Sequence, residues 1–143
     1  MTIPGLDGRK MSKSYDNVIP IFAPPEQLRK CVMRIVTDSR RPEEPKEPDT
    51  CNVFAIYRHF ASPEAIEATR QRYLNGGLAY SEIKNELFEL LDDAFREARQ
   101  RYEALLADRD SIDRMLRQGA EKARAIATPM MQKIQRAIGI IVK

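Results

Sequence analysis

Apolar residues recur every three or four positions along most of this 143-residue chain, starting near residue 25. This spacing gathers apolar side chains on one face of an α-helix, whereas a half-buried strand would require strict alternation. No segment makes a convincing strand, so we expect an all-α protein, a helical bundle of four to five helices. The predicted helices span about 25–37, 50–62, 63–75, 81–107 and 110–139.

Local start and stop signals set the predicted boundaries. Thr50 and Asp110 are expected to cap helices, because their side-chain oxygens can accept hydrogen bonds from free backbone N–H groups of the first turn. Ser62, followed by proline and glutamate, opens the third helix. The Gly76-Gly77 pair stops it, because glycine readily adopts the conformation that ends a helix.

The last predicted helix has the longest apolar stripe, which we expect to lie in the core. Pro129 lies inside it and should kink or split the helix near Ala127, because proline lacks the N–H that the helix needs. The stripe comprises Ile112, Met115, Leu116, Ala120, Ala123, Ile126, Ala127, Met130, Ile134 and Ile138.

Two stretches lack helical periodicity. Residues 1–23 carry the turn dipeptides Pro4-Gly5 and Asp7-Gly8, followed by a short apolar run that contains Pro20. We interpret them as an irregular loop and connector ahead of a helical domain spanning 24–143. Residues 38–49 hold three prolines and almost no apolar side chains, which predicts an exposed linker within that domain.

The composition argues against a membrane protein, a secreted protein and a metal-binding protein. No run of about 18 apolar residues exists, and the N-terminus lacks the layout of a signal peptide, so we expect a cytoplasmic protein that does not enter a membrane. Cys31 and Cys51 lie far from other cysteines or histidines at ligand spacing, which predicts free buried thiols and no metal site. His59 is expected to be structural.

The net charge of +3 hides an uneven distribution. Residues 1–41 carry eight Lys/Arg against four Asp/Glu, residues 42–109 carry nine against fourteen, and residues 110–143 carry seven against three. Basic ends can bind the phosphates of a nucleotide or of RNA. Solvated helix faces show the same asymmetry, so the charge alone leaves both interpretations open.

The segment Lys10-Met11-Ser12-Lys13-Ser14 places two cations and two hydroxyl groups within five positions. A loop of this composition can wrap a polyphosphate, because ammonium groups and hydroxyls both donate to phosphate oxygens. Two basic residues in a surface loop also arise by chance. The residues alone therefore leave phosphate binding and an ordinary solvated loop equally open.

The whole stretch from Gly5 to Asn17 resembles the KMSKS signature loop of class I aminoacyl-tRNA synthetases, with all five signature letters at 10–14. Further segments are similar to the bacterial tryptophanyl-tRNA synthetase family, and the resemblance continues to Lys143. These segments are the Pro24-Pro25-Glu26 helix start, PEEPKEPDT at 42–50, Gly76-Gly77-Leu78 and GAEKAR at 119–124.

The resemblance implies a ligase that activates tryptophan with ATP and transfers it to tRNA(Trp). Lys10 and Lys13 would be the catalytic residues that hold the ATP phosphates and stabilise charge in the transition state. Met11, Ser12 and Ser14 would complete the ATP-binding loop. Mg²⁺ would accompany ATP, with no metal site on the protein itself.

The resemblance also implies that the helical part contacts the anticodon region of tRNA. The parent protein would be a homodimer that binds neither DNA nor membranes. For the basic residues of the last helix, phosphate contact and a solvated face remain equally weighted alternatives. The candidate tRNA-binding residues are Arg114, Arg117, Lys122 and Arg124.

The family's nucleotide-binding sheet domain, with a His-x-Gly-His type element, should precede the loop. Because this chain contains one histidine and begins just before the loop, we expect a C-terminal fragment that is inactive alone. The alternatives are a non-catalytic RNA-binding helical module and a structural bundle in which the loop is incidental.

Overall fold

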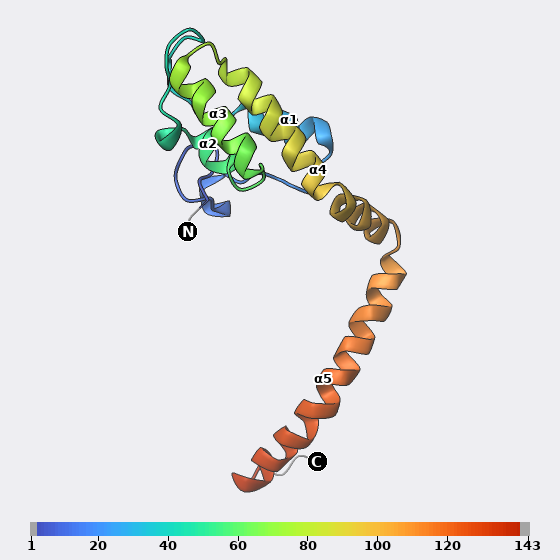
Figure 1. Ribbon diagram of the computed structural model, residues 1–143. Coiled ribbons are helices and arrows are strands. Elements are labelled where there is room, and N and C mark those ends of the chain that lie inside the picture. Colours follow the sequence, from blue (N-terminus) through green and yellow to red (C-terminus); the bar gives the residue numbers. More distant parts are fainter. Residues whose placement is uncertain (1–2, 141–143) are drawn as a thin grey trace. The chain divides into compact units, whose positions relative to one another are not determined.

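A computed structural model describes residues 3–140 of the chain. Within this part no strand is present beyond a single antiparallel bridge between Pro4 and Lys10. The prediction of an all-α fold is therefore confirmed (Figure 1). The helices are α1 (Pro25–Met33), α2 (Asn52–Tyr57), α3 (Pro63–Asn75), α4 (Tyr80–Ala107) and α5 (Arg109–Ala137), with 3₁₀ turns η1 (Lys13–Tyr15) and η2 (Pro48–Thr50).

The chain divides into two compact units, the first ending at Gln100 and the second starting at Arg101. The first contains the N-terminal loop, α1 to α3 and most of α4, whereas the second contains the end of α4 and all of α5. Leu6 and Ile19 belong to the same buried cluster as the helices of the first unit. The predicted division after residue 23 stays a prediction.

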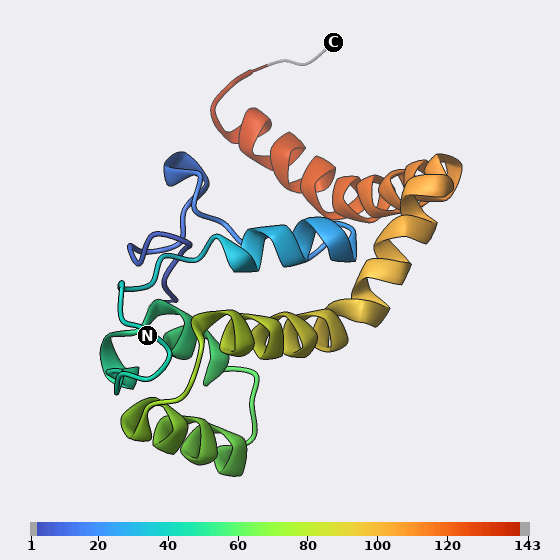
Figure 2. The same cartoon turned by 90° about the horizontal axis from the view of Figure 1, so that it is seen from above.

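The core of the first unit is built from the apolar faces of α1 to α4. Figures 1 and 2 agree in placing α1 beside the first part of α4. The guanidinium of Arg29 donates to the side-chain oxygen of Asn85 at 3.0 Å, and Lys84 Nζ donates to the carbonyl of Met33 at 3.0 Å. The most deeply buried side chains are Leu28, Val32, Ile35, Val53, Phe54, Ile56, Tyr73, Leu78, Ile83, Leu87 and Leu91.

Two predicted helix caps are wrong by one or two residues. Cys51, not Thr50, precedes α2, because Thr50 is already used in the η2 turn that Pro48 begins. Asp108, not Asp110, caps α5. Its carboxylate accepts a hydrogen bond from the backbone N–H of Ser111 at 3.0 Å, which leaves Asp110 inside the first turn.

The start and end of α3 follow the sequence signals, whereas α1 and α2 end earlier than the predicted residues 37 and 62. Ser62 caps α3 by accepting a hydrogen bond from the N–H of Ala65 at 3.2 Å. The helix stops at Gly76 and Gly77, which both have positive φ. α1 ends at Met33 rather than near Thr37, because the N–H of Arg34 turns to the carbonyl of Cys31.

α5 departs from its prediction in two ways. It runs as one helix through Pro129, so the predicted split is wrong (Figure 1). Proline removes one backbone hydrogen bond, but the hydrogen bonds of the other turns keep this 29-residue helix continuous. None of its described side chains is buried, so the predicted core stripe is wrong as well. Among its described residues, the second unit contains no other helix than the end of α4 to pack against α5. The most exposed stripe residues are Ile126, Leu116 and Ile138 at 79%, 65% and 64%.

The proline-rich segment 38–49 is more than the exposed linker that its composition predicts. Lys46 is only 2% exposed and Pro48 is buried. The backbone N–H of Lys46 donates to the carbonyl of Tyr73 at 2.7 Å, which fixes the segment to α3. The prediction of an exposed linker is therefore wrong at these two positions.

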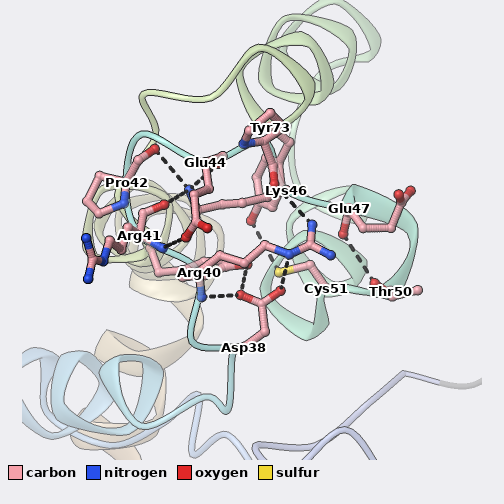
Figure 3. Close-up of polar contacts among 12 residues, drawn as sticks. Asp38, Arg40, Arg41, Pro42, Glu44, Lys46, Glu47, Thr50, Cys51 and Tyr73 are labelled. Carbon is pink, nitrogen blue, oxygen red and sulfur yellow. Dashed lines mark hydrogen bonds and ion pairs between the residues drawn. The ribbon is translucent and has the colours of Figure 1, made fainter.

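The Lys46 side chain holds the segment in a defined shape (Figure 3). Its ammonium donates to the backbone carbonyls of Arg41 at 2.8 Å, Pro42 at 3.1 Å and Glu44 at 3.0 Å. It also lies 5.4 Å from the centre of the Tyr80 ring. Because the charge is surrounded by oxygen dipoles and an aromatic face, its burial is compensated.

Candidate phosphate-binding loop

The loop carrying the two motif lysines is folded back on itself. The N–H of Gly5 donates to the carbonyl of Arg9 at 2.7 Å, and the N–H of Met11 donates to the carbonyl of Ile3 at 3.2 Å. These bonds flank the bridge between Pro4 and Lys10. The residues before the motif therefore form a short hairpin that ends where the basic segment begins.

The second half of the motif forms the η1 turn. Ser12 precedes this turn and its hydroxyl oxygen accepts a hydrogen bond from the N–H of Ser14 at 3.3 Å. The two serine hydroxyls also lie 2.7 Å apart. Asp16 ends the turn in the left-handed conformation, with its N–H on the carbonyl of Lys13. Lys13 therefore starts a capped turn.

Asn17 joins the two halves of the loop. Its side chain is buried, with 2% of the residue exposed. Its Oδ1 accepts from the N–H of Ser12 at 2.8 Å, while its Nδ2 donates to the carboxylate of Asp7 at 2.7 Å and to the carbonyl of Lys10 at 3.2 Å. The Asn17 side chain is therefore hydrogen-bonded to the backbone of Lys10 and Ser12 as well as to Asp7.

Asp7 and Arg9 form an ion pair within the loop. Arg9 Nε donates to Asp7 Oδ2 at 2.6 Å, and the Arg9 guanidinium lies 4.6 Å from the centre of the Tyr15 ring. The hydrogen bond from Asn17, followed by those from Arg9, holds the pKa of Asp7 below its ordinary value. Asp7 therefore compensates the charge of Arg9.

The two motif lysines carry the uncompensated charge of the loop. Both are exposed, and among residues 3–140 neither side chain forms an ion pair. Ser14 is exposed as well, whereas Met11 and Ser12 are half-buried, and Met11 packs against the core. All five predicted ATP-binding residues therefore lie in one ordered loop, with ammonium groups free to meet an anion.

Two hydrogen bonds connect this loop to α2 through Val36. The N–H of Val36 donates to the carbonyl of Leu6 at 2.8 Å, and Asn52 Nδ2 donates to the carbonyl of Val36 at 3.0 Å. No periodic pattern along the chain predicts these contacts. Leu6 was the available signal, because an apolar residue between turn dipeptides often anchors a loop on a core.

A cavity of about 300 Å³ lies near this attachment, and the sequence pattern did not indicate it. The Tyr80 hydroxyl donates to Asp38 Oδ1 at 2.7 Å beside it. Desolvation raises the pKa of the Asp38 carboxyl, but the hydrogen bonds from Tyr80 and Arg40 outweigh it, so that the pKa lies below its ordinary value. The cavity is lined by Val36, Thr37, Asp38, Thr50, Cys51, Asn52 and Tyr80.

The remaining candidate groups are placed as follows. Cys31 and Cys51 are free, with Cys51 buried and Cys31 half-buried. The described part of the chain contains no cluster of three or more His, Cys, Asp or Glu able to hold a metal ion. It also contains no helix long and apolar enough to cross a membrane.

The candidate tRNA-binding residues all lie on the surface of α5. Arg114 is 3.9 Å from the carboxylate of Asp108, a distant pair between exposed groups that contributes little to stability. Exposure is required both for contact with phosphates and for a solvated face. The geometry therefore leaves the role of Arg114, Arg117, Lys122 and Arg124 as a prediction.

Comparison with known proteins identifies a family. The family model described as tRNA synthetases class I (W and Y) matches residues 2–96. A tryptophan–tRNA ligase from Pseudomonas aeruginosa is 55% identical over 97% of this chain, and one from Rhodopirellula baltica is 41% identical over 96%. The chain spans 31% and 43% of the length of these two proteins.

Solved structures give the same result. The tryptophanyl-tRNA synthetase from Campylobacter jejuni, complexed with ADP and tryptophan, superposes with a TM-score of 0.93 and 42% sequence identity. A second structure of that enzyme superposes with a TM-score of 0.87. In both comparisons the match covers 97% of this chain and 44% of the other.

Proposed function

Because this chain belongs to the class I tRNA synthetase family of the tryptophan and tyrosine enzymes, we propose that it supplies the ATP-phosphate loop and the tRNA-binding helices of a tryptophan–tRNA ligase. The reaction would activate tryptophan with ATP, release pyrophosphate and transfer the amino acid to tRNA(Trp). The relatives are about two to three times longer than this chain, so the complete activity is proposed for the full-length gene product.

One observation carries the proposal. The KMSKS stretch lies in an ordered loop whose two lysines are exposed and lack ion-pair partners among the described residues, while the neighbouring Arg9 is compensated by Asp7. Unpaired ammonium groups attract an anion, whereas the charge of a paired arginine is already balanced by its carboxylate partner. The loop is therefore suited to a polyphosphate at Lys10 and Lys13.

In the proposed reaction Lys10 and Lys13 bind the ATP phosphates and stabilise the negative charge that builds up on the leaving pyrophosphate. A well-aimed donor of this kind contributes about 3 to 4 kcal/mol to transition-state stabilisation. Ser12 and Ser14 donate hydroxyl hydrogen bonds, and Met11 packs the loop. Mg²⁺ would enter only as the counter-ion of ATP.

The proposal also includes the partners of the full-length protein. The basic residues of α5 would contact tRNA phosphates, while aromatic or guanidinium groups would stack on unpaired bases. A homodimer and a cytoplasmic location follow from the resemblance to the family. Sedimentation velocity on the full-length protein tests the dimer, and a single monomeric species contradicts it.

Exchange of labelled pyrophosphate into ATP, measured with the full-length gene product, tests the proposed reaction. We expect exchange that depends on tryptophan and not on tyrosine. Lys13→Ala should lower its rate by about 100-fold or more and leave tRNA affinity nearly unchanged, because the charge acts on the transition state. Lys30→Ala, an exposed lysine on α1, is the matched control and should retain full activity. Normal exchange in Lys13→Ala contradicts the assigned role.

A further inference from the structure

We propose that Asn17, through its hydrogen bond to Asp7, is a positioning residue that fixes the backbone carrying Lys10 and Lys13 for ATP binding. This inference rests on the proposed function, since it assigns to that reaction a residue outside the KMSKS letters. Asn17 is buried, so it acts through the loop and not by touching ATP.

The amide of Asn17 contacts the motif backbone on both sides of Met11. Its Nδ2 donates to the carbonyl of Lys10, and its Oδ1 accepts from the N–H of Ser12. Ser12 in turn caps the turn that begins at Lys13. The single amide group of Asn17 therefore fixes the backbone conformation at both lysines. Among the described residues, the exposed lysine side chains form no ion pair that could fix it.

Asn17 packs directly against Gly5. A Cβ on Gly5 would collide with the side-chain amide and the carbonyl oxygen of Asn17. The carbonyl of Asn17 also accepts from the N–H of Leu6 at 3.0 Å. This close approach explains why residue 5 is a glycine. It also places Asn17 between the hairpin and the motif.

Asp7 fixes the orientation of the Asn17 amide. Its Oδ1 accepts from Asn17 Nδ2 at 2.7 Å and from the N–H of Arg9 at 3.1 Å. An ionised carboxylate can only accept hydrogen bonds, so it selects the NH₂ side of the amide. With Nδ2 on Asp7, Oδ1 is left for Ser12. Exchanging the two residues would exchange donor and acceptor while keeping their contact.

This exchange provides the test. Asn17→Asp places a second carboxylate against Asp7 and removes the donor to Lys10, and we expect kcat/KM for ATP in the exchange reaction to fall by about 100-fold, with a raised KM for ATP. The double variant Asp7→Asn/Asn17→Asp restores a donor opposite the carboxylate. It should recover at least tenfold, although the contact with the Lys10 carbonyl stays lost.

The KM for ATP separates positioning from a general loss of folding. Misfolding lowers the amount of active enzyme and hence the apparent kcat, but leaves the KM for ATP unchanged. Asp93→Asn, an exposed carboxylate on α4, is a matched control and should not alter either constant. An unchanged KM in Asn17→Asp, or no recovery in the double variant, overturns the proposal.

Hydrogen–deuterium exchange across residues 9–17 of the same proteins tests the positioning role of Asn17 separately from the proposed function. Inactive wild-type protein would contradict the proposed function. The loop should still exchange slowly in wild type, quickly in Asn17→Asp and more slowly again in the double variant. Equal exchange in all three overturns the role of Asn17 whatever the activity.

Discussion

Lys46 shows how a single charged side chain can order a segment that its composition marks as an open linker. Prolines at 42, 45 and 48 exclude a regular helix or strand ladder, and the segment has little apolar surface to bury. The Lys46 ammonium donates to three backbone carbonyls, of which those of Arg41 and Pro42 also accept from the N–H groups of Glu44 and Gly77. Order here comes from a charge and dipoles rather than from apolar packing.

Replacing Lys46 with methionine keeps most of the side-chain volume but removes the donors. We expect the free energy of unfolding to fall by about 3 kcal/mol, because three charge-assisted hydrogen bonds from one ammonium group are lost. Urea denaturation measures the change. Lys30→Met, at an exposed position of α1, should change stability by less than about 0.5 kcal/mol. Equal effects of the two substitutions contradict the assigned role.

Asp49 gives the fold a defined dependence on acid. Both of its oxygens accept from Arg70 at 2.9 Å, and this pairing lowers the pKa of Asp49 in the folded chain. The unfolded chain, with a carboxyl pKa of about 3.9, therefore binds the proton more readily. The stabilisation is complete above about pH 5 and is lost as the pH falls through the folded-state value.

We expect Asp49→Asn to lose less stability than wild type between pH 6 and pH 3 in urea denaturation. Arg70→Gln should flatten the pH dependence in the same way, because it removes the partner that lowers the pKa. Wild-type slopes in both variants would show that this pair does not couple protonation to folding.

At the scale of the elements, periodicity predicts helices better than it predicts burial. The stripe of α4 begins with Ile83, Leu87 and Leu91, which are all buried. The equally regular stripe of α5 has no buried residue, and its Pro129 does not end the helix. Helix formation depends on local spacing and capping, whereas burial depends on whether another element covers the face.

The turn from α3 to α4 allows a matched test of two adjacent glycines. Gly76 has φ 77° and ψ −179°, a region essentially restricted to glycine, and a Cβ there would collide with the carbonyl of Glu43. Gly77 has φ 83° with no atom within 4 Å of such a Cβ. We expect Gly77→Ala to cost about 1 kcal/mol of stability and Gly76→Ala about 3 kcal/mol, measured by urea denaturation. Equal losses would mean that contact with Glu43 is unimportant.

At the scale of the whole molecule, the two compact units carry different proposed tasks. The first holds the candidate phosphate-binding loop against the core through Leu6, which belongs to the buried cluster and accepts a hydrogen bond from Val36. The second presents an exposed basic helix. Phosphate binding needs a fixed backbone for two charges, whereas contact with tRNA tolerates an exposed surface whose charges act over several ångströms.

Salt dependence tests the tRNA contacts of α5. In filter binding of labelled tRNA(Trp) to the full-length protein, the double variant Arg117→Gln/Arg124→Gln should weaken binding. Its slope against salt concentration should be smaller by about 1.4, because each lost phosphate contact with single-stranded RNA removes about 0.7. The lysine-to-glutamine change at Lys30 is the control. Unchanged affinity and slope would favour a solvated face.

The sequence by itself determined the helices, the position of the KMSKS loop and the family resemblance that the comparisons then confirmed. These follow from periodicity, turn residues and a contiguous motif, which all depend on neighbours along the chain. Tertiary structure decided that Lys46 is buried, that Leu6 anchors the loop and that Asp7 orients Asn17. These contacts join residues through the folded chain, and a lysine in a proline-rich stretch looks the same in sequence whether water or three carbonyls surround it.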